Sequence, residues 1–308
     1  MLKSAICDML KIKYPVFQGG MAHIADADLA AAVSNGGGLG IISAMNYDAK
    51  YLKGQIDKAR SLTDKPFGVN VMLMSPHTDE VAKLLADEKV SVITTGAGNP
   101  EKYMKMWNDA GIKVIPVVAS TALAKIVERL GASAVIAEGG ESGGHVGDTT
   151  TMALVPQVCD AVSVPVLAAG GMAAALMLGA VGVQIGTRFL VATECNVHQN
   201  YKNKVLKAGD ISTIVTGKRL GHPVRSIKTP FSRAYSKAEY SDISDNDLEN
   251  MAVGALRLAA VEGDEKNGCF LAGQIAGMVN KEQSAKEIIE EICTDAEKIL
   301  KGAEKWVN

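Results

Sequence analysis

The sequence is poor in aromatic residues, because Phe, Trp and Tyr together make up only 5% of its 308 residues. No apolar run approaches the roughly 20 residues that a membrane-spanning helix needs. Neither sign of charge dominates, since 32 Lys and Arg residues face 34 Asp and Glu residues and leave a net charge of −2. A protein that binds nucleic acid through its phosphates needs a basic face. These absences argue against a membrane protein and against a general nucleic-acid binder.

The five cysteines are far apart in the sequence and include no C-x-x-C pair. Disulfide frameworks and structural zinc sites use closely or regularly spaced cysteines, so we expect neither, and we predict no metal site. The N-terminal stretch MLKSAICDMLKIKYP lacks the long apolar segment and the cleavage site of a signal peptide. We therefore expect a cytoplasmic protein.

Apolar residues and glycine are plentiful. Hydrophobic residues make up 47% of the sequence, which is enough for a large buried core and excludes wholesale disorder. The 31 glycines are about 10% of the 308 residues, whereas glycine makes up about 7% of an average protein.

Apolar, β-branched stretches alternate with amphipathic helical patterns along the chain. Most of the strand candidates are apolar throughout, which is typical of parallel strands covered on both faces. Eight such strands with intervening helices predict an α/β fold, a (β/α)8 TIM barrel, whose usual size is about 250 residues. The predicted strands are 14–20, 38–43, 67–73, 90–96, 113–118, 133–139, 165–171 and 182–187, and the helical patterns include 26–37, 77–89, 121–131 and 151–162.

The alternation stops after the eighth strand. Residues 196–245 are polar and irregular, and a helical pattern over 244–262 follows. We predict that 1–195 and 279–308 form the barrel, with the last helix closing it, and that 196–278 form a smaller inserted subdomain over its mouth. The alternative is a doubly wound open sheet. It predicts a G-x-G-x-x-G fingerprint after the first strand, which QGGMAHIAD does not match.

Two glycine-containing stretches follow the last two predicted strands, AAGG at 168–171 and QIGT at 184–187. In such barrels the loops after strands seven and eight are the usual phosphate site. Glycine lets a backbone N–H approach a ligand, and a following helix N-terminus attracts phosphate. Thr187 adds a hydroxyl donor. The pair of loops predicts a phosphorylated ligand, with ordinary tight turns as the alternative.

A second candidate site is EGGESGGHVG at 138–147, after the sixth strand. It contains His145, and imidazole is the side chain best suited to move protons near neutral pH. Glu138 and Glu141 lie close to it in sequence. His222, in the predicted insertion, could also touch a ligand.

Two further strand ends carry candidate residues. Asn70 interrupts the apolar strand GVNVML, where a polar amide needs a partner, so it could bond a cofactor ring or pin a neighbouring loop. Gly20 and Met21 follow the first strand in QGGM, and Met21 offers a flexible apolar surface for a flat ring, or is an ordinary core methionine.

Six motifs in order resemble the nitronate monooxygenase-like flavoproteins, namely YPVFQGGM, PFGVNVML, TTGAGNP, EGGESGGHVG, PVLAAGG and VQIGTRF. Within that group the chain most resembles the FabK-type, FMN-dependent enoyl-acyl carrier protein reductases. The resemblance extends over essentially the whole chain, including the GHPVRSIKTP insertion. Nitronate monooxygenases usually carry glutamine where this chain has Glu138, and the reductases carry glutamate.

The resemblance implies roles for individual residues. His145 matches the active-site histidine. The positions that match FMN-binding residues are Gly20, Met21, Asn70, Glu138, Gly143, Gly144, Gly170, Gly171, Gln184, Gly186 and Thr187.

One stretch departs from the family pattern. After Gly171 the sequence AAGGMAAALMLGA is about six residues shorter than the usual loop and helix start. Either the loop is trimmed and the helix begins almost at the phosphate, or the sequence omits a loop here; we favour the second reading.

The resemblance also implies an activity. NADH or NADPH would reduce FMN, which would then reduce a trans-2-enoyl thioester on acyl carrier protein in bacterial type II fatty-acid synthesis. Family analogy adds a homodimer and a dependence on a monovalent cation. Three alternatives stay open: a nitronate monooxygenase that uses O2, an NAD(P)H:quinone reductase, and a flavin-binding sensor without turnover.

A carrier protein is acidic, so the resemblance also predicts a basic docking surface on the insertion. Arg219, Arg225, Lys228 and Arg233 are its candidate residues.

Overall fold

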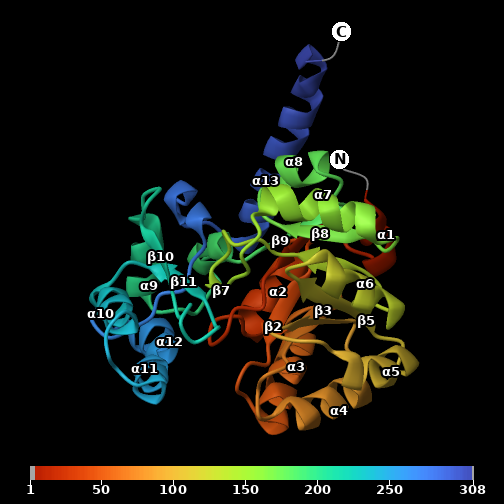
Figure 1. The fold of residues 1–308 in the computed structure, drawn as a ribbon. Coiled ribbons are helices and arrows are strands. Elements are labelled where there is room, and N and C mark those ends of the chain that lie inside the picture. The colour runs from red at the N-terminus through yellow and green to blue at the C-terminus, as the bar shows by residue number, and fades with distance from the viewer. Residues whose placement is uncertain (1–3, 307–308) are drawn as a thin grey trace.

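The computed structural model describes residues 4–306. Eight parallel strands are hydrogen-bonded in the order β1-β9-β8-β6-β5-β4-β3-β2 (Figure 1). The ring closes where Phe17 and Leu39 form a parallel bridge between β1 and the residue before β2. The predicted barrel is therefore confirmed, and the open-sheet alternative is excluded. The strands are β1 Val16–Gln18, β2 Gly40–Ser43, β3 Phe67–Met72, β4 Val92–Gly96, β5 Lys113–Val118, β6 Val135–Ala137, β8 Val166–Ala169 and β9 Gly182–Ile185.

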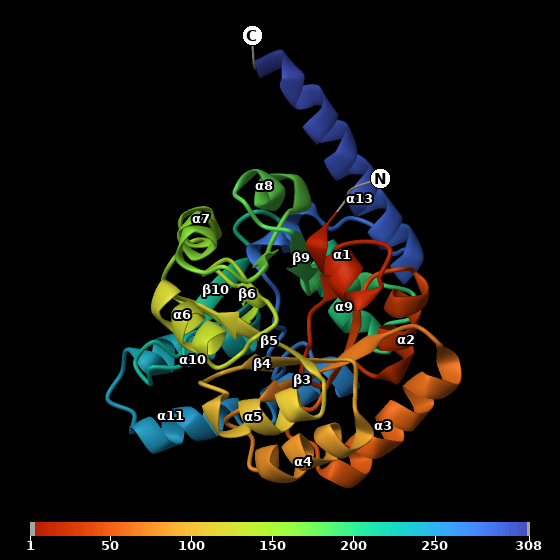
Figure 2. The same cartoon turned by 90° about the vertical axis from the view of Figure 1, so that its right-hand side faces the viewer.

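Helices connect these strands and cover the outside of the barrel (Figure 2). Side chains cap several of them, since Asp26 accepts a hydrogen bond from Leu29 N and Ser120 accepts one from Leu123 N. Gly131 has φ +88° just after the helix over 121–129, as the glycine at that end predicts. The helices are α1 Ala5–Leu10, α2 Ala27–Asn35, α3 Ala49–Leu62, α4 Thr78–Glu88, α5 Glu101–Asp109, α6 Thr121–Arg129, α7 Thr151–Ala161, α8 Met172–Met177 and α13 Ala285–Lys301.

The core has two layers. Inward-pointing side chains such as Phe17, Ile41 and Ile115 fill the inside of the barrel, and Ile6 and Leu10 of α1 pack against them. A larger cluster lies between the strands and the outer helices. The filled interior leaves the strand ends, and not the barrel centre, as the place for a ligand.

The elements of 196–278 gather beside the mouth of the barrel (Figure 1). They include a three-stranded antiparallel sheet in the order β10-β11-β7, whose third strand, β7, belongs to the loop after β6. The sequence did not reveal this sheet. Besides β7 Gly144–His145, the elements are α9 Gln199–Leu206, β10 Thr213–Thr216, β11 Val224–Ile227, α10 Pro230–Glu239, α11 Asp245–Ala252 and α12 Ala255–Arg257, with helical turns η2 Leu258–Glu262 and η3 Gln274–Met278. Two more helical turns lie outside this segment, η1 Thr187–Val191 after β9 and η4 Gly302–Trp306 after α13.

One expectation for this region was wrong. The single helix predicted over 244–262 is interrupted after Ala252, because Gly254 adopts a left-handed conformation with φ +74°. The domain boundaries remain a prediction, and the ends of the predicted barrel portion, residues 1–3 and 307–308, lie outside the described residues.

The C-terminal helix α13 packs against α2 and α8 and projects beyond the rest of the molecule in both views (Figures 1 and 2). Its first turn has a capping box, in which Ser284 and Glu287 satisfy each other's backbone N–H groups. Within residues 4–306, no helix is both long enough and apolar enough to span a bilayer.

Candidate functional site

The carboxyl ends of the parallel strands meet on one rim of the barrel, and the loops that follow them are rich in glycine. A Cβ added to Gly96 or Gly171 would meet no other atom within 4 Å, so the backbone at both positions faces open space. Such bare backbone is what a flat, phosphorylated ligand needs for close approach.

Gly20 and Asn70 lie directly against each other at the ends of β1 and β3. Thr94 Oγ1 donates a hydrogen bond to Asn70 Oδ1 at 2.9 Å, and Asn70 Nδ2 points at the Gly20 carbonyl oxygen at 3.4 Å. The amide thus pins the loop after β1, which was one of the two roles foreseen for it. Its role towards a cofactor stays a prediction.

Met21 connects the first and the last strand loops. A Cβ added to Gly186 would lie 3.7 Å from the Met21 sulfur, and Gly19 N donates to the Ile185 carbonyl at 2.9 Å. The fold therefore brings Gly20, Met21, Asn70 and Gly186 together, as the predicted site requires.

The two predicted phosphate loops are also neighbours, because Ala169 in β8 pairs with Gln184 in β9. Gln184 is buried, and its Oε1 has no hydrogen-bond partner among the described residues, which leaves an acceptor for a bound group. Thr187 Oγ1 already accepts a hydrogen bond from Gly273 N at 2.9 Å. Gly171 directly precedes the short helix α8, so the chain here runs without the longer loop of the family pattern.

Glu138 stands at the end of β6. It is only partly exposed, and burial among protein atoms raises the pKa of its carboxyl group to about 7. The nearby Ser142 hydroxyl lowers this pKa slightly, although its Oγ makes no hydrogen bond of normal geometry. A carboxyl group that is half protonated near neutral pH can both donate and accept, as a glutamine amide does.

Glu141 binds the start of helix α7 and not the rim of the barrel. Its carboxylate accepts hydrogen bonds from Thr151 N at 3.0 and 3.1 Å and from Thr151 Oγ1 at 2.9 Å, at the start of α7. This is a helix-capping contact, so the structure separates Glu141 from the chemistry expected of Glu138 and His145.

His145 lies in the two-residue strand β7, where it pairs with Val224 of β11. Although His145 is exposed at the mouth, desolvation by surrounding protein atoms lowers its pKa, and the charge of His222 lowers it further. The neutral imidazole is therefore the dominant form at pH 7, with one N–H donor. His222 lies in the hairpin turn two residues before Val224, where its charge acts on His145. Its contact with a ligand stays a prediction.

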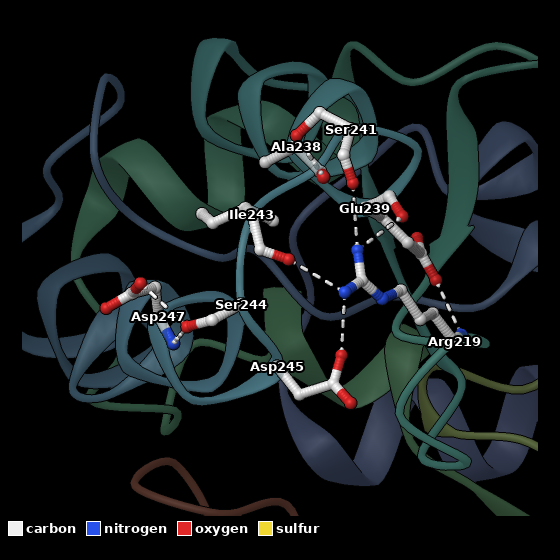
Figure 3. Close-up of polar contacts among 8 residues, drawn as sticks. All are labelled: Arg219, Ala238, Glu239, Ser241, Ile243, Ser244, Asp245 and Asp247. Carbon is white, nitrogen blue, oxygen red and sulfur yellow. Dashed lines mark hydrogen bonds and ion pairs between the residues drawn. The ribbon is translucent and has the colours of Figure 1, made fainter.

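The four basic residues predicted for docking differ in their surroundings. The guanidinium of Arg219 donates to the carbonyls of Glu239, Ser241 and Ile243 and pairs with Asp245 at 2.8 Å (Figure 3). It joins the β10–β11 hairpin to the α10–α11 connection, so its charge is used inside the subdomain.

The other three extend this contrast. Arg225 is bound to the Gly140 carbonyl, and Lys228 Nζ donates to the Ile211 carbonyl at 2.7 Å. The side chain of Arg233 makes no hydrogen bond or ion pair within residues 4–306 and borders a cavity of about 450 Å³. The basic wall of this cavity comes from Lys204, Lys207, Lys228 and Arg233, and Glu265 supplies one acid that pairs with Lys204.

Two parts of the site were missed from the sequence. Thr95 of β4 is buried with a hydroxyl that lacks a partner within the described part of the chain, and only its place in TTGAGNP pointed to it. The contacts of Gly273 and Gln274 with Thr187 and Glu141 were not foreseen, because they join segments far apart in sequence.

Known proteins match this chain over nearly its whole length. FabK from Thermotoga maritima superposes with a TM-score of 0.97 at 46% sequence identity, with both chains covered completely. A (3aS,4S,5R,7aS)-5-hydroxy-7a-methyl-1-oxo-octahydro-1H-indene-4-carboxyl-CoA dehydrogenase of Rhodococcus jostii is 32% identical and covers 96% of each chain. A probable nitronate monooxygenase of Staphylococcus aureus is 32% identical and covers 88% of this chain and 91% of its own. The nitronate monooxygenase family model matches residues 3–84 and 78–295, and the chain belongs to this family.

Proposed function

We propose that the chain is an FMN-dependent enoyl-acyl carrier protein reductase that uses NADH or NADPH. The observation that carries the proposal is the full-length match to FabK at 46% identity, which includes the elements around the mouth. The presence of Glu138 rather than glutamine in loop 138–147 points the same way.

The rim fits FMN. Gln184 Oε1 is a buried acceptor without a partner in the described part of the chain, and Gly171 offers backbone in open space. When bound there, FMN would supply hydride transfer from the nicotinamide to the β-carbon of the enoyl thioester, and the α-carbon would take up a proton. The residues that would hold it are Gly20, Met21, Asn70, Glu138, Gly143 and Gly144, together with Gly170, Gly171, Gln184, Gly186 and Thr187 of the two predicted phosphate loops.

His145 is best suited to donate a hydrogen bond. Because its pKa is lowered, the ring is neutral at pH 7 and its N–H can face the thioester oxygen as negative charge develops there. A strong general acid would need the imidazolium, which the surrounding protein disfavours. We therefore favour a role for His145 as hydrogen-bond partner of the thioester oxygen over a role as proton donor.

The matched proteins also define the alternatives. By its name, the Rhodococcus relative acts on a CoA thioester. The alternative substrate for this chain is therefore an acyl group carried by CoA instead of by the carrier protein. The Staphylococcus relative keeps nitronate oxidation as the second candidate.

One experiment separates these reactions. The yellow absorbance of oxidised flavin in the purified protein is followed without oxygen, first with NADPH or NADH and then with a crotonyl thioester. A reductase loses its yellow colour with the nicotinamide and regains it with the thioester. A nitronate monooxygenase is not bleached by the nicotinamide, a quinone reductase is re-oxidised by quinone only, and a sensor shows no turnover.

The remaining proposals concern the surroundings of the enzyme. We place it in the cytoplasm, with enoyl-acyl carrier protein as its partner and a homodimer as its assembly. Light scattering of the purified protein tests the dimer. Activity assays in potassium, ammonium and Tris buffers test whether the enzyme depends on a monovalent cation.

A further inference from the structure

The side chain of Arg225 joins the inserted segment to the loop that carries His145. Its Nη2 and Nε donate to the Gly140 carbonyl oxygen at 2.8 and 3.2 Å, and its Nη1 donates to Thr213 Oγ1 at 3.0 Å. Thr213 belongs to β10, which pairs with β11. The guanidinium is therefore bonded to its own sheet through Thr213 and to the loop through Gly140. Hydrogen bonds from a charged donor are roughly twice as strong as neutral ones.

Loop 138–147 has little regular structure of its own. Its only strand, β7, is two residues long and pairs with β11 through two residue pairs, His145 with Val224 and Gly144 with Arg225. Val146 N adds one hydrogen bond to the Pro223 carbonyl at 3.0 Å. So short a pairing is weak by itself, and the position of His145 therefore depends on contacts elsewhere in the loop.

Gly140 is well placed to transmit such a contact. Its N–H donates to the Thr149 carbonyl at 2.9 Å, and a Cβ added to it would lie 2.7 Å from the Gly147 oxygen. The two ends of the loop are thus packed against each other at Gly140. Glu138 lies two residues before this point and His145 five residues after it.

We propose that Arg225 is a positioning residue, which fixes Gly140 and thereby sets the place of Glu138 and His145 over the strand ends. The inference rests on the proposed function for its catalytic meaning, because the loop carries the residues assigned to the reaction. It replaces the docking role expected for Arg225 from its charge.

The chain offers a matched control. Arg219 lies in the same hairpin and also donates to backbone carbonyls, but its partners all belong to the subdomain (Figure 3). Arg219→Met therefore removes a comparable set of bonds without releasing loop 138–147. Arg225→Lys supplies a milder change, because an ammonium group cannot reproduce the forked contact.

The test compares Arg225→Met, Arg225→Lys and Arg219→Met by three measurements: FMN affinity from fluorescence, the His145 pKa from NMR titration, and kcat and KM with a crotonyl thioester. A misplacement of about 1 Å can cost about 10²-fold in rate, so we expect Arg225→Met to lower kcat by 10- to 100-fold. The His145 pKa should rise towards its ordinary value as the loop loosens, and Arg225→Lys should fall between this variant and the wild type.

Arg219→Met should lower thermal stability but leave kcat and the His145 pKa unchanged. Equal effects of the two Met variants on kcat and on the His145 pKa would reduce Arg225 to a general stabiliser of the subdomain. An unchanged His145 pKa in both Arg225 variants would overturn the inference. If the wild type did not reduce enoyl thioesters, the proposed function would fail, but FMN affinity and the His145 titration would still decide the role of Arg225.

Discussion

Gly20 lies so close to Asn70 that a Cβ added to the glycine would stand 2.2 Å from the Asn70 Cβ and 2.6 Å from its Cγ. No side chain fits between the loop after β1 and the amide of β3. The glycine is therefore required by packing at this point, and not only by the ligand that the rim is expected to hold.

Gly20→Ala should consequently destabilise the protein and weaken FMN binding together. Overpacking of this kind costs about 1–3 kcal/mol, because Asn70 or the loop must move. Urea unfolding and FMN titration measure the two effects. Gly54→Ala is the control, since a Cβ there meets nothing within 4 Å and the position lies in helix α3, where alanine stabilises by roughly 0.5–1 kcal/mol. Equal stability of both variants would contradict the close contact.

Glu138 should make stability depend on pH in a specific window. Its folded-state pKa, about 7, lies above the ordinary value of 4.5, so the folded protein holds this proton more tightly than the unfolded chain. Its contribution to stability is complete below pH 4.5 and is lost as the pH rises through about 7. Glu138→Gln removes this titration and should be more stable than the wild type at pH 8, by roughly 3 kcal/mol.

At pH 5 the two proteins should differ little, because both carry a neutral side chain at this position. Urea unfolding at pH 5 and pH 8 measures the difference. A stability difference that is the same at both pH values would show that Glu138 is not the titrating group.

His145→Ala should keep FMN but lose most of its enoyl reduction. Loss of a positioned donor lowers the rate by about 10²-fold or more. The flavin spectrum reports retention of FMN, and crotonyl thioester turnover reports the loss. His77→Ala is the control, because the His77 side chain is 39% exposed and pairs with the surface residue Glu80 at 2.6 Å. Near-normal turnover by a folded His145→Ala protein would remove this residue from the mechanism.

His222→Gln should raise the pKa of His145. Desolvation is the larger cause of the lowered pKa and the charge of His222 is the smaller, so the value should move up without reaching the ordinary one. Imidazole resonances in an NMR titration measure it. An unchanged His145 pKa would mean that the two histidines do not interact electrostatically. The hairpin turn would then lie farther from the rim than the structure places it.

The barrel could be predicted because each strand is a run of apolar residues that can be recognised from the local sequence alone. The three-stranded sheet could not, because β7 has two residues and its pairing joins His145 to Val224, far along the chain. The predicted helix over 244–262 ignored the left-handed Gly254. Arg219 and Arg225 looked like free charges, since the carbonyls that bind them belong to remote backbone that no local pattern reveals.

The basic cavity leaves a narrower prediction for the carrier-protein partner. Of its four basic side chains, Lys204 pairs with Glu265 and Lys228 binds a carbonyl, whereas Lys207 and Arg233 make no side-chain contact of this kind within residues 4–306. An acidic partner would therefore meet Lys207 and Arg233 first. The double variant Lys207→Glu and Arg233→Glu should raise the KM for crotonyl-acyl carrier protein by about tenfold at low salt, and less at high salt.

Crotonyl-pantetheine is the decisive comparison, because it carries the thioester without phosphate or protein charge. Its KM should change less than twofold, and Lys83→Glu with Lys125→Glu, on the outer helices α4 and α6, should leave both substrates unaffected. An equal rise for both thioesters would mean that the variant disturbs the mouth itself. A rise for crotonyl-CoA as large as that for the carrier-bound substrate would show that the cavity recognises phosphate groups and not the acidic surface of a carrier protein.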